Sequence, residues 1–302
     1  MWKSSLTTDE AAAVDALVDR AAGVDGTSAL NEDAHLARNT GSYRHLLHHE
    51  DGELAGYLAY SADHGTAQLV VDPAQRRRGI GRRLVDQLAE LAAPRLWAFG
   101  DAPAARGLAH HFGLVEGRAL LVMEKVFEHK PGDFGDSRGL STPTASTARF
   151  VRAATGIELR GYLPGDAKAL LAVNAAAFAH HPEQGGLDAA GLASRMAEDW
   201  FDPEGLIVAV EDGRLLGFHW TKRVGDVGEV YVLGVDPSAQ GRGLGRRLLA
   251  AGLDHLASAG CRSVILYVDK ADTVAVGLYE SAGFAVIHRD VLYVPQGEQE
   301  GV

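Results

Sequence analysis

One loop pattern occurs twice in this chain of 302 residues, and it limits the fold more than any other feature. Residues 236–245 begin with Asp-Pro and end with Gly-Leu-Gly, and residues 72–81 begin with Asp-Pro and end with Gly-Ile-Gly. Each loop follows a segment typical of a strand, and the second also precedes leucines at helical spacing. Two such units in one chain predict an α/β protein built by tandem duplication.

Two further landmarks support the duplication. Hairpin turns are predicted at residues 50–53 and 211–214, and a late helix end at 111–114 matches one at 281–284. The chain length suits about two domains, and a Gly-, Ser-, Thr- and Pro-rich segment separates the copies. We therefore expect domains 1–140 and 141–302, each with a mixed central sheet flanked by helices.

Local patterns place several elements. Helices are predicted at 7–22, from residue 32 onward, at 166–178 and at 273–281, and a polar loop is predicted at 178–186. Predicted strands lie at 54–60, 67–71, 157–160, 204–210, 215–221, 229–233 and 264–268.

Composition excludes several classes of protein. The net charge of −11 argues against non-specific nucleic-acid binding, and no apolar run is long enough to span a membrane. The acidic, polar N-terminus is unlike a signal peptide, and Cys261 is the only cysteine, so no internal disulfide can form. None of the histidines shows metal-ligand spacing, and three pairs of histidines are adjacent in the sequence: His48–His49, His110–His111 and His180–His181. We expect a cytoplasmic monomer without a bound metal.

The repeated loop has the chemistry of an anion cradle. Its glycines let backbone N–H groups approach a phosphate, and the following helix N-terminus adds partial positive charge. Arg242, Arg246 and Arg247 can add charge-assisted hydrogen bonds. The pattern is neither a P-loop nor a complete dinucleotide fingerprint.

The segment Gln240-Gly241-Arg242-Gly243-Leu244-Gly245 resembles the pyrophosphate loop of the GNAT superfamily of N-acetyltransferases. The resemblance implies the acyl-CoA N-acyltransferase fold in both copies, with acetyl-CoA as co-substrate. In the first copy it assigns to acetyl-CoA Leu69, Val70, Val71, Arg77, Arg78, Gly79, Ile80, Gly81 and Arg82. In the second copy it assigns Leu233, Gly234, Val235, Gln240, Gly241, Arg242, Gly243, Leu244, Gly245, Arg246, Asp272, Thr273, Val274, Ala275, Val276 and Gly277.

Only the second copy carries side chains suited to acetyl transfer. The reaction needs a base for the amine and an acid for the leaving thiolate. Glu229 lies seven residues before Asp236, where the first copy has Gly65, and Tyr279 lies four residues before a helix-ending glycine, where the first copy has Ala109. We expect Glu229 to be the base or to hold the water that acts as base, and Tyr279 to be the acid. A backbone N–H of Leu233 or Val235 would polarise the carbonyl, with a bulge at Gly234.

A tandem pair with a degenerate first copy resembles the mycothiol synthase family. The matching segments include 173–185, 199–203, 218–222, 228–245 and 266–268. The resemblance implies that the acceptor is the cysteinyl amine of cysteinyl-glucosaminyl-inositol. It assigns Glu183, Lys222, Glu229 and Tyr267 to the acceptor site, with Glu32 contributed by the first domain.

One position departs from the family pattern, and two other functions compete with this interpretation. Ala271-Asp272 stands where the family has Asp-Asn, so Asp272 can cap the next helix but the contact that Asn makes to CoA is in question. The chain could instead acetylate another small amine, such as an aminoglycoside or a peptide. It could also be a regulator that binds acetyl-CoA without turnover, which the presence of Glu229 and Tyr279 argues against.

Overall fold

The computed structural model describes residues 1–36, 41–128, 156–179 and 182–298. The chain divides into two compact units. The first comprises Met1–Val122, Val268–Thr273 and Val286–Val302, and the second comprises Met123–Tyr267 and Val274–Ala285. The expected domain boundary near residue 140 lies outside the described residues.

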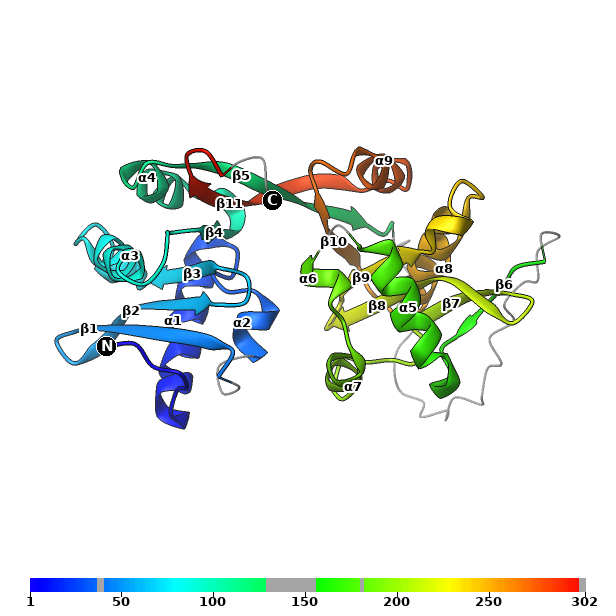
Figure 1. Ribbon diagram of the computed structural model, residues 1–302, viewed down its shortest axis with the longest axis horizontal. Coiled ribbons are helices and arrows are strands. Elements are labelled where there is room, and N and C mark those ends of the chain that lie inside the picture. Colours follow the sequence, from blue (N-terminus) through cyan, green and yellow to red (C-terminus); the bar gives the residue numbers. More distant parts are fainter. Residues whose placement is uncertain (37–40, 129–155, 180–181, 299–302) are drawn as a thin grey trace. The chain divides into compact units, whose positions relative to one another are not determined.

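The first unit is an α/β layer structure (Figure 1). Its helices and strands are α1 (Thr8–Asp25), α2 (Glu32–Leu36), β1 (Tyr43–Glu50), β2 (Glu53–Ser61), β3 (Thr66–Val71), α3 (Ile80–Ala89), β4 (Leu96–Ala98), α4 (Pro103–His111) and the first part of β5 (Leu114–Val126). Helix α1 begins with a capping box, in which Thr7 accepts from the Glu10 backbone and Glu10 accepts from the Thr7 backbone. It ends at Gly26, whose φ of 75° is left-handed.

Two apolar cores cover the two faces of the first sheet. On one face, Leu84 and Leu88 of α3 pack with Leu58 of β2. On the other face, Val14 and Leu17 of α1 pack with Tyr57, the neighbour of Leu58 along the same strand. Successive strand side chains point to opposite faces, so one strand serves both cores. Helices therefore lie on both faces, as expected from the sequence.

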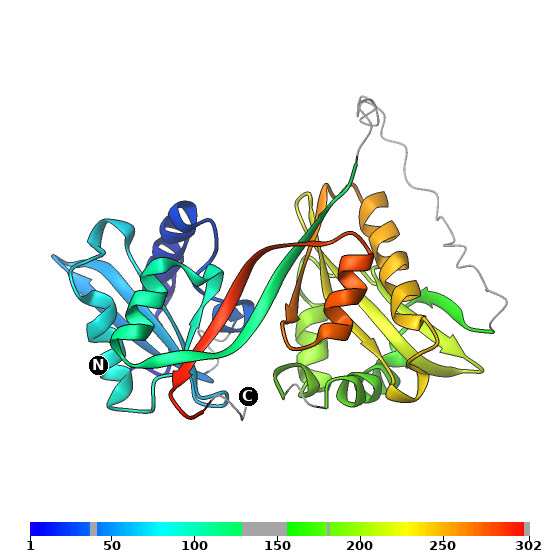
Figure 2. The same cartoon turned by 90° about the horizontal axis from the view of Figure 1, so that it is seen from above.

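The second unit repeats this arrangement (Figure 2). Its elements are β6 (Glu158–Gly161), α5 (Ala167–Ala177), α6 (Pro182–Gly185), α7 (Ala189–Met196), β7 (Leu206–Glu211), β8 (Arg214–Val224), β9 (Val227–Val235), α8 (Leu244–Ser258), β10 (Ser263–Asp269) and α9 (Thr273–Ser281). Helix α8 packs on one face through Leu244 and Leu248, and α5 packs on the other through Leu170 and Val173. The predicted loop at 178–186 is wrong in part, because it contains the short helix α6.

Both predicted hairpins have the same turn. Asp51 and Gly52 have φ values of 52° and 87°, and Asp212 and Gly213 have φ values of 49° and 80°. Two successive residues with positive φ define the tight turn that matches the twist of paired strands. The turns join Glu50 to Glu53 and Glu211 to Arg214 in antiparallel register.

The final strand of the chain belongs to the first unit. Most of β11 (Ala285–Pro295) lies in that unit, where Val291 pairs with Ala98 of β4 in antiparallel register. Residues 123–126 of β5 lie in the second unit, where β5 neighbours β10. Each unit therefore includes a strand segment from the other half of the sequence.

Among the described helices, none is both long enough and apolar enough to cross a membrane.

Candidate functional site

In each unit, two parallel strands separate just before the glycine loop. Strands β3 and β4 pair only at Ala67–Leu96 and Gln68–Trp97, although β3 continues to Val71. Strands β9 and β10 pair from Val227–Ser263 to Glu229–Ile265, although β9 continues to Val235. The divergence leaves the end of each central strand without a partner on that side.

Backbone N–H groups point into this divergence. In the second unit the N–H of Asp236 donates to Leu216 O at 2.8 Å, toward β8. Since alternate residues of a strand direct their N–H groups to opposite sides, those of Leu233 and Val235 point away from β8. In the first unit Asp72 N donates to Ala55 O at 2.9 Å, toward β2. The N–H groups of Leu69 and Val71 therefore point away from β2.

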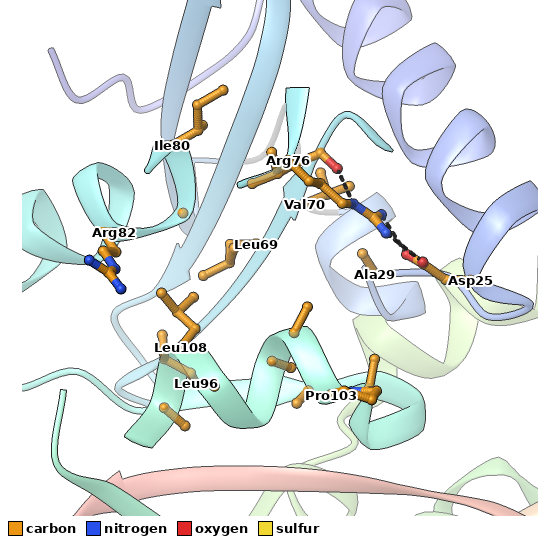
Figure 3. Close-up of a pocket in the computed structure, with 18 of the residues that line it drawn as sticks. Asp25, Ala29, Leu69, Val70, Arg76, Ile80, Arg82, Leu96, Pro103 and Leu108 are labelled. Atoms are coloured by element: carbon orange, nitrogen blue, oxygen red, sulfur yellow. Dashed lines mark hydrogen bonds and ion pairs between the residues drawn. The ribbon is translucent and has the colours of Figure 1, made fainter. Parts of the chain in front are cut away.

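A cavity of about 580 Å³ occupies the divergence in the first unit (Figure 3). Its largely apolar wall is formed by the end of β3, the glycine loop, β4 and α4, together with Asp25 at the end of α1 and Ala29 after it. Arg78, which the sequence analysis also assigns to acetyl-CoA, is exposed and is not part of the wall. The other assigned residues of the first copy all line the cavity: Leu69, Val70, Val71, Arg77, Gly79, Ile80, Gly81 and Arg82.

The two glycine loops share one backbone conformation. Gly79 and Gly243 precede α3 and α8 with φ values of 82° and 72°, and neither helix start has a side-chain cap. Arg77 has a φ of 66°, close to the 74° of the equivalent Gly241. Both helix N-termini therefore present N–H groups that no capping side chain takes up.

The contacts beneath the loops are also equivalent. A Cβ added to Gly81 would lie 3.5 Å from Leu108 and 3.8 Å from Val71. A Cβ added to Gly245 would lie 3.7 Å from Leu278 and 3.9 Å from Val235. In both units the glycine loop therefore packs against the end of the central strand and against a later helix. That helix is α4 in the first unit and α9 in the second.

The two loops differ in the ion pairs that hold them. In the first unit, Arg76 binds Asp25 through two hydrogen bonds of 2.7 Å, and Figure 3 shows it directed away from Arg82. Arg20 of α1 also binds Asp72 at 2.8 Å. Two ion pairs therefore link the first glycine loop to α1, one through Arg20 and one through Asp25 at the end of the helix.

In the second unit the ties run to the β7–β8 hairpin instead. Arg214 binds Asp236 at 2.9 Å, and Arg242 binds Glu211 at 2.9 Å. The hydrogen bond from Arg242 lowers the pKa of the Glu211 carboxyl. Arg242 is thus paired within the protein in this structure, while Arg246 is exposed, and a phosphate contact by either stays a prediction.

The strand residues assigned to the acceptor lie on one sheet face. Lys222 pairs with Glu229 across β8 and β9, and Glu229 pairs with Ile265 of β10. Tyr267 is two residues beyond Ile265 and 47% exposed, so it shares this face. Lys222, Glu229 and Ile265 also line a small cavity of about 150 Å³. The structure therefore brings three of the five assigned acceptor residues together.

The bulge in β9 is not where the sequence analysis expected it. Trp220 pairs with Val232 and Thr221 with Val230, so Tyr231 is the extra residue. The prediction of a bulge at Gly234 is wrong, because Gly234 pairs regularly with Phe218. A Cβ at Gly234 would lie 2.9 Å from the Phe218 ring, so close packing requires this glycine. Between β2 and β3 the register runs without a shift, so Thr66, opposite Ser61, has the ladder position that Glu229 has opposite Lys222. The expectation that Gly65 is the counterpart of Glu229 is therefore wrong by one residue, because β9 has the extra residue Tyr231 and β3 has none.

Tyr279 lies on α9 and is only 8% exposed, with its ring edge-on to Phe284 at 5.9 Å between centroids. Its counterpart Ala109 is buried in α4.

The remaining assigned residues are divided between the two units. Asp272 and Thr273 group with the first unit, whereas Val274, Ala275, Val276 and Gly277 group with the second. Glu32 begins α2 of the first unit, and Glu183 lies in α6 with its side chain outside the described part of the chain. Their proposed contacts stay predictions.

Two aromatic rings that no sequence pattern predicts lie beside Lys222. The Lys222 ammonium lies 5.0 Å from the Trp200 ring centroid and 5.3 Å from that of Tyr231. Trp220 packs against both rings. The alternation of Phe218, Trp220 and Lys222 along β8 signals a shared face, but no local pattern links it to Trp200. The part of the chain that is described has no cluster of three or more His, Cys, Asp or Glu suited to a metal ion.

Two α/β units, each with a divergent strand pair and an uncapped glycine loop, define a tandem GNAT acetyltransferase. The sequence model of the acetyltransferase (GNAT) family matches residues 12–114 and 177–284. The chain therefore belongs to the GNAT acetyltransferase family, and within it to the group of mycothiol acetyltransferases shown by its full-length relatives.

Those relatives match over nearly the whole chain. Mycothiol acetyltransferase of Nocardia farcinica is 44% identical over 98% of this chain and 97% of its own. That of Thermomonospora curvata is 43% identical over 97% and 96%.

Solved structures agree on the fold. A tandem GNAT protein from the clavulanic acid biosynthesis pathway has a TM-score of 0.67 at 19% identity, covering 96% of this chain and 95% of its own. A GCN5-related N-acetyltransferase from Sphaerobacter thermophilus has a TM-score of 0.65 at 23% identity, covering 97% and 94%.

Proposed function

We propose that this protein transfers the acetyl group of acetyl-CoA to the cysteinyl amine of cysteinyl-glucosaminyl-inositol, giving mycothiol and CoA. The observation that carries the proposal is the match to mycothiol acetyltransferases over nearly the full chain. The acidic side chain on β9 and the tyrosine on α9, both specific to the second unit, support transfer at that unit.

The glycine loops would hold the pyrophosphate of acetyl-CoA. Gly79 and Gly243 place uncapped helix N-termini beside the divergent strands, where backbone N–H groups and the helix dipole favour an anion. The pantetheine chain would extend along the strand end toward the divergence. The first cavity has the loop and the apolar wall for CoA, but its unit has Thr66 in place of the base Glu229 and Ala109 in place of the acid Tyr279. We propose that it binds CoA without turnover.

In the second unit Glu229 would accept a proton from the acceptor ammonium, directly or through water. An α-amino group has a pKa near 8, so a carboxylate is a sufficient base. The free amine would attack the thioester carbonyl carbon, and the N–H groups of Leu233 or Val235 would stabilise the oxyanion that forms. As the tetrahedral intermediate collapses, the C–S bond breaks and Tyr279 would donate its proton to the thiolate. The extra proton on the attacking nitrogen would pass through solvent to the tyrosinate, which leaves a neutral amide and restores Tyr279.

Acceptor contacts would come from Glu183, Lys222, Glu229 and Tyr267. Carboxylates suit an ammonium with three donors, and an ammonium such as that of Lys222 suits hydroxyl or carbonyl oxygens. The match over nearly the full chain is to mycothiol acetyltransferases, so a single acceptor is proposed.

The test is a panel of amines with the full chain and acetyl-CoA. The panel contains cysteinyl-glucosaminyl-inositol, glucosaminyl-inositol, cysteinamide and an aminoglycoside, with product measured by liquid chromatography and mass spectrometry. We expect the first compound to give by far the highest kcat/KM and to be acetylated on nitrogen. Preferred acetylation of glucosaminyl-inositol or the aminoglycoside would reject this acceptor while retaining the acetyltransferase. CoA binding without transfer to any of these amines would instead favour a regulatory protein that binds acetyl-CoA without turnover.

A further inference from the structure

Aromatic residues lie beside Lys222, and what we infer from them rests on the proposed role of that sheet face in acceptor binding. Lys222 lies opposite Glu229 in the β8–β9 ladder, and both line the cavity of about 150 Å³. A group bound beside the Glu229 carboxylate would therefore lie near the Lys222 side chain. The position of the ammonium then affects how an acceptor is held.

Two rings define that position. The Lys222 Nζ lies 5.0 Å from the centroid of Trp200 and 5.3 Å from that of Tyr231, and the two rings are 4.9 Å apart. Both distances are within the range in which a ring face attracts a cation. We name the Trp200 and Tyr231 rings the aromatic seat.

Tyr231 is itself held from two sides. It is the extra residue of the β9 bulge, so the backbone directs its ring toward the face of Trp220 and Lys222. Its hydroxyl accepts a hydrogen bond of 2.9 Å from Nε of Arg195 on α7. The fully buried Trp220 packs 5.5 Å from the Tyr231 ring and 6.0 Å from Trp200. The seat is therefore part of a packed layer.

A seated lysine differs physically from a solvated one. A free lysine side chain has large rotamer entropy, which is lost when it binds a ligand. A cation already held over two rings has lost much of that freedom before the ligand arrives, so binding becomes less costly. The rings contact one side of the ammonium and attract it without accepting conventional hydrogen bonds.

We propose that Trp200 and Tyr231 are positioning residues for the acceptor. They hold the Lys222 ammonium beside Glu229, where it donates to hydroxyl or carbonyl oxygens of the polyhydroxylated amine, and Arg195 fixes Tyr231 through its hydroxyl. The second unit thereby selects an acceptor with oxygen groups near its amine.

Steady-state kinetics with cysteinyl-glucosaminyl-inositol test the proposal. Trp200→Leu and Tyr231→Leu should each raise the acceptor KM about three- to thirtyfold, the range for losing one cation–ring contact. The KM for acetyl-CoA and kcat should stay within about twofold of wild type. Trp200→Phe keeps a ring and should restore most acceptor affinity, and Tyr231→Phe should cost only about two- to fivefold. Phe201→Leu, which removes a ring packed on Trp220, is the matched control and should behave as wild type.

A double-mutant cycle separates positioning from general packing. If Trp200 acts through Lys222, Trp200→Leu should have little further effect on the acceptor KM in a Lys222→Met background. An equal KM increase in both backgrounds would overturn the proposal, as would an unchanged KM in Trp200→Leu.

A measurement without turnover distinguishes this proposal from the proposed function. Reductive ¹³C-methylation of the full chain gives one dimethyl-lysine NMR signal per lysine, and Lys222→Arg identifies the signal of Lys222. Ring currents should shift that signal upfield in wild type, and Trp200→Leu should return it toward the position of solvated lysines. An unshifted wild-type signal would refute the seat even if acetyl transfer occurs. If the wild-type protein showed the shifted signal but did not acetylate the acceptor, the proposed acetyl transfer would be rejected. The position of Lys222 over the aromatic seat would still be supported.

Discussion

Glu229 is the residue that most clearly separates the two units. It occupies β9 at the point where the ladder with β10 ends, and it is half-buried beside Lys222. In the strand ladder the equivalent residue of the first unit is Thr66, whose hydroxyl is not a carboxylate base. Of the two units, the second alone therefore carries the base that we propose for the transfer.

We expect Glu229→Gln to lower kcat about 10²- to 10⁴-fold, the usual contribution of a general base. The amide keeps the size of the side chain but cannot accept the ammonium proton, so the KM for acetyl-CoA should change little. Part of the lost rate should return at high pH, where the acceptor amine is already neutral. A variant with wild-type kcat at pH 7 would remove Glu229 from the mechanism.

His219 sets a pH dependence of stability that is separate from catalysis. It is fully buried against α8, and its Nδ1 lies 2.9 Å from Leu248 O, while its Nε2 has no hydrogen-bond partner among the described residues. Burial lowers its pKa from 6.5 to about 4. As the pH falls below 6.5, this histidine becomes protonated in the unfolded chain but stays neutral in the folded chain. Its contribution to the free energy of unfolding is therefore fully present above pH 6.5 and is lost as the pH drops toward 4.

Between pH 7 and pH 5 this one group should lower the free energy of unfolding by about 2 kcal/mol. Urea denaturation of the wild type and His219→Met at both pH values checks the prediction. The variant can be less stable at pH 7, but it should lose less stability on acidification because the other histidines are common to both proteins. Equal losses in the two proteins would show that His219 titrates normally.

At the scale of elements, the two glycine loops are restrained by different neighbours. The loop of the first unit is tied to α1 and its end by Arg20–Asp72 and Arg76–Asp25. Asp25 lines the first cavity and neutralises Arg76 there. A bound CoA, which is a polyanion, would meet an arginine already paired with a carboxylate.

We expect Asp25→Asn to strengthen CoA binding at the first cavity about three- to tenfold, because the freed guanidinium gains a charge-assisted bond and a repelling carboxylate is lost. Calorimetric titration with CoA measures this in a Gly243→Val background, which disables the second loop. Asp51→Asn, an exposed change at the hairpin turn, is the control and should bind as the parent does. Weaker binding in Asp25→Asn would show that the pair stabilises the binding form of the loop.

Elements with local signals could be predicted from the sequence, whereas those set by distant pairing could not. The Asp-Gly hairpins, the glycine loops and α9 all carry their own turn, cap or periodic pattern, and the structure confirms them. The bulge at Tyr231 depends on how β8 and β9 are registered, which neither strand encodes alone. The aromatic seat likewise needs a loop residue, Trp200, to meet a strand residue more than twenty positions later. The placing of β11 depends on the edge offered by β4.

At the scale of the whole molecule, the first unit is not complete without the end of the chain. Val291 and Val294 of β11 are fully buried there, and Tyr293 donates a hydrogen bond of 2.6 Å to Asp101. Asp101 is itself buried with a φ of 43° and binds Arg289 at 2.8 Å. These contacts hold the segment between β4 and α4 that leads into the wall of the first cavity.

A fragment of residues 1–140 should therefore fail to fold cooperatively, although it contains the complete first sequence repeat. Adding a synthetic peptide of residues 284–298 should restore a cooperative thermal transition, because the peptide supplies the strand beside β4. A peptide with Val291→Asp and Val294→Asp is the matched control and should not. Circular dichroism during heating measures both, and a fragment that melts cooperatively alone would contradict the prediction.

Of the two similar units, we propose that the second alone performs the transfer. Gly79 and Gly243 hold equivalent left-handed positions, and a valine at either is strained by its φ and adds bulk to that cradle. The decisive measurement is kcat/KM for acetyl-CoA, at saturating cysteinyl-glucosaminyl-inositol, in the matched variants Gly79→Val and Gly243→Val. We predict a loss of about 100-fold or more in Gly243→Val, since several loop N–H contacts to the pyrophosphate are disturbed together, and a change within about twofold in Gly79→Val. A large loss in Gly79→Val, or wild-type turnover in Gly243→Val, would contradict the account.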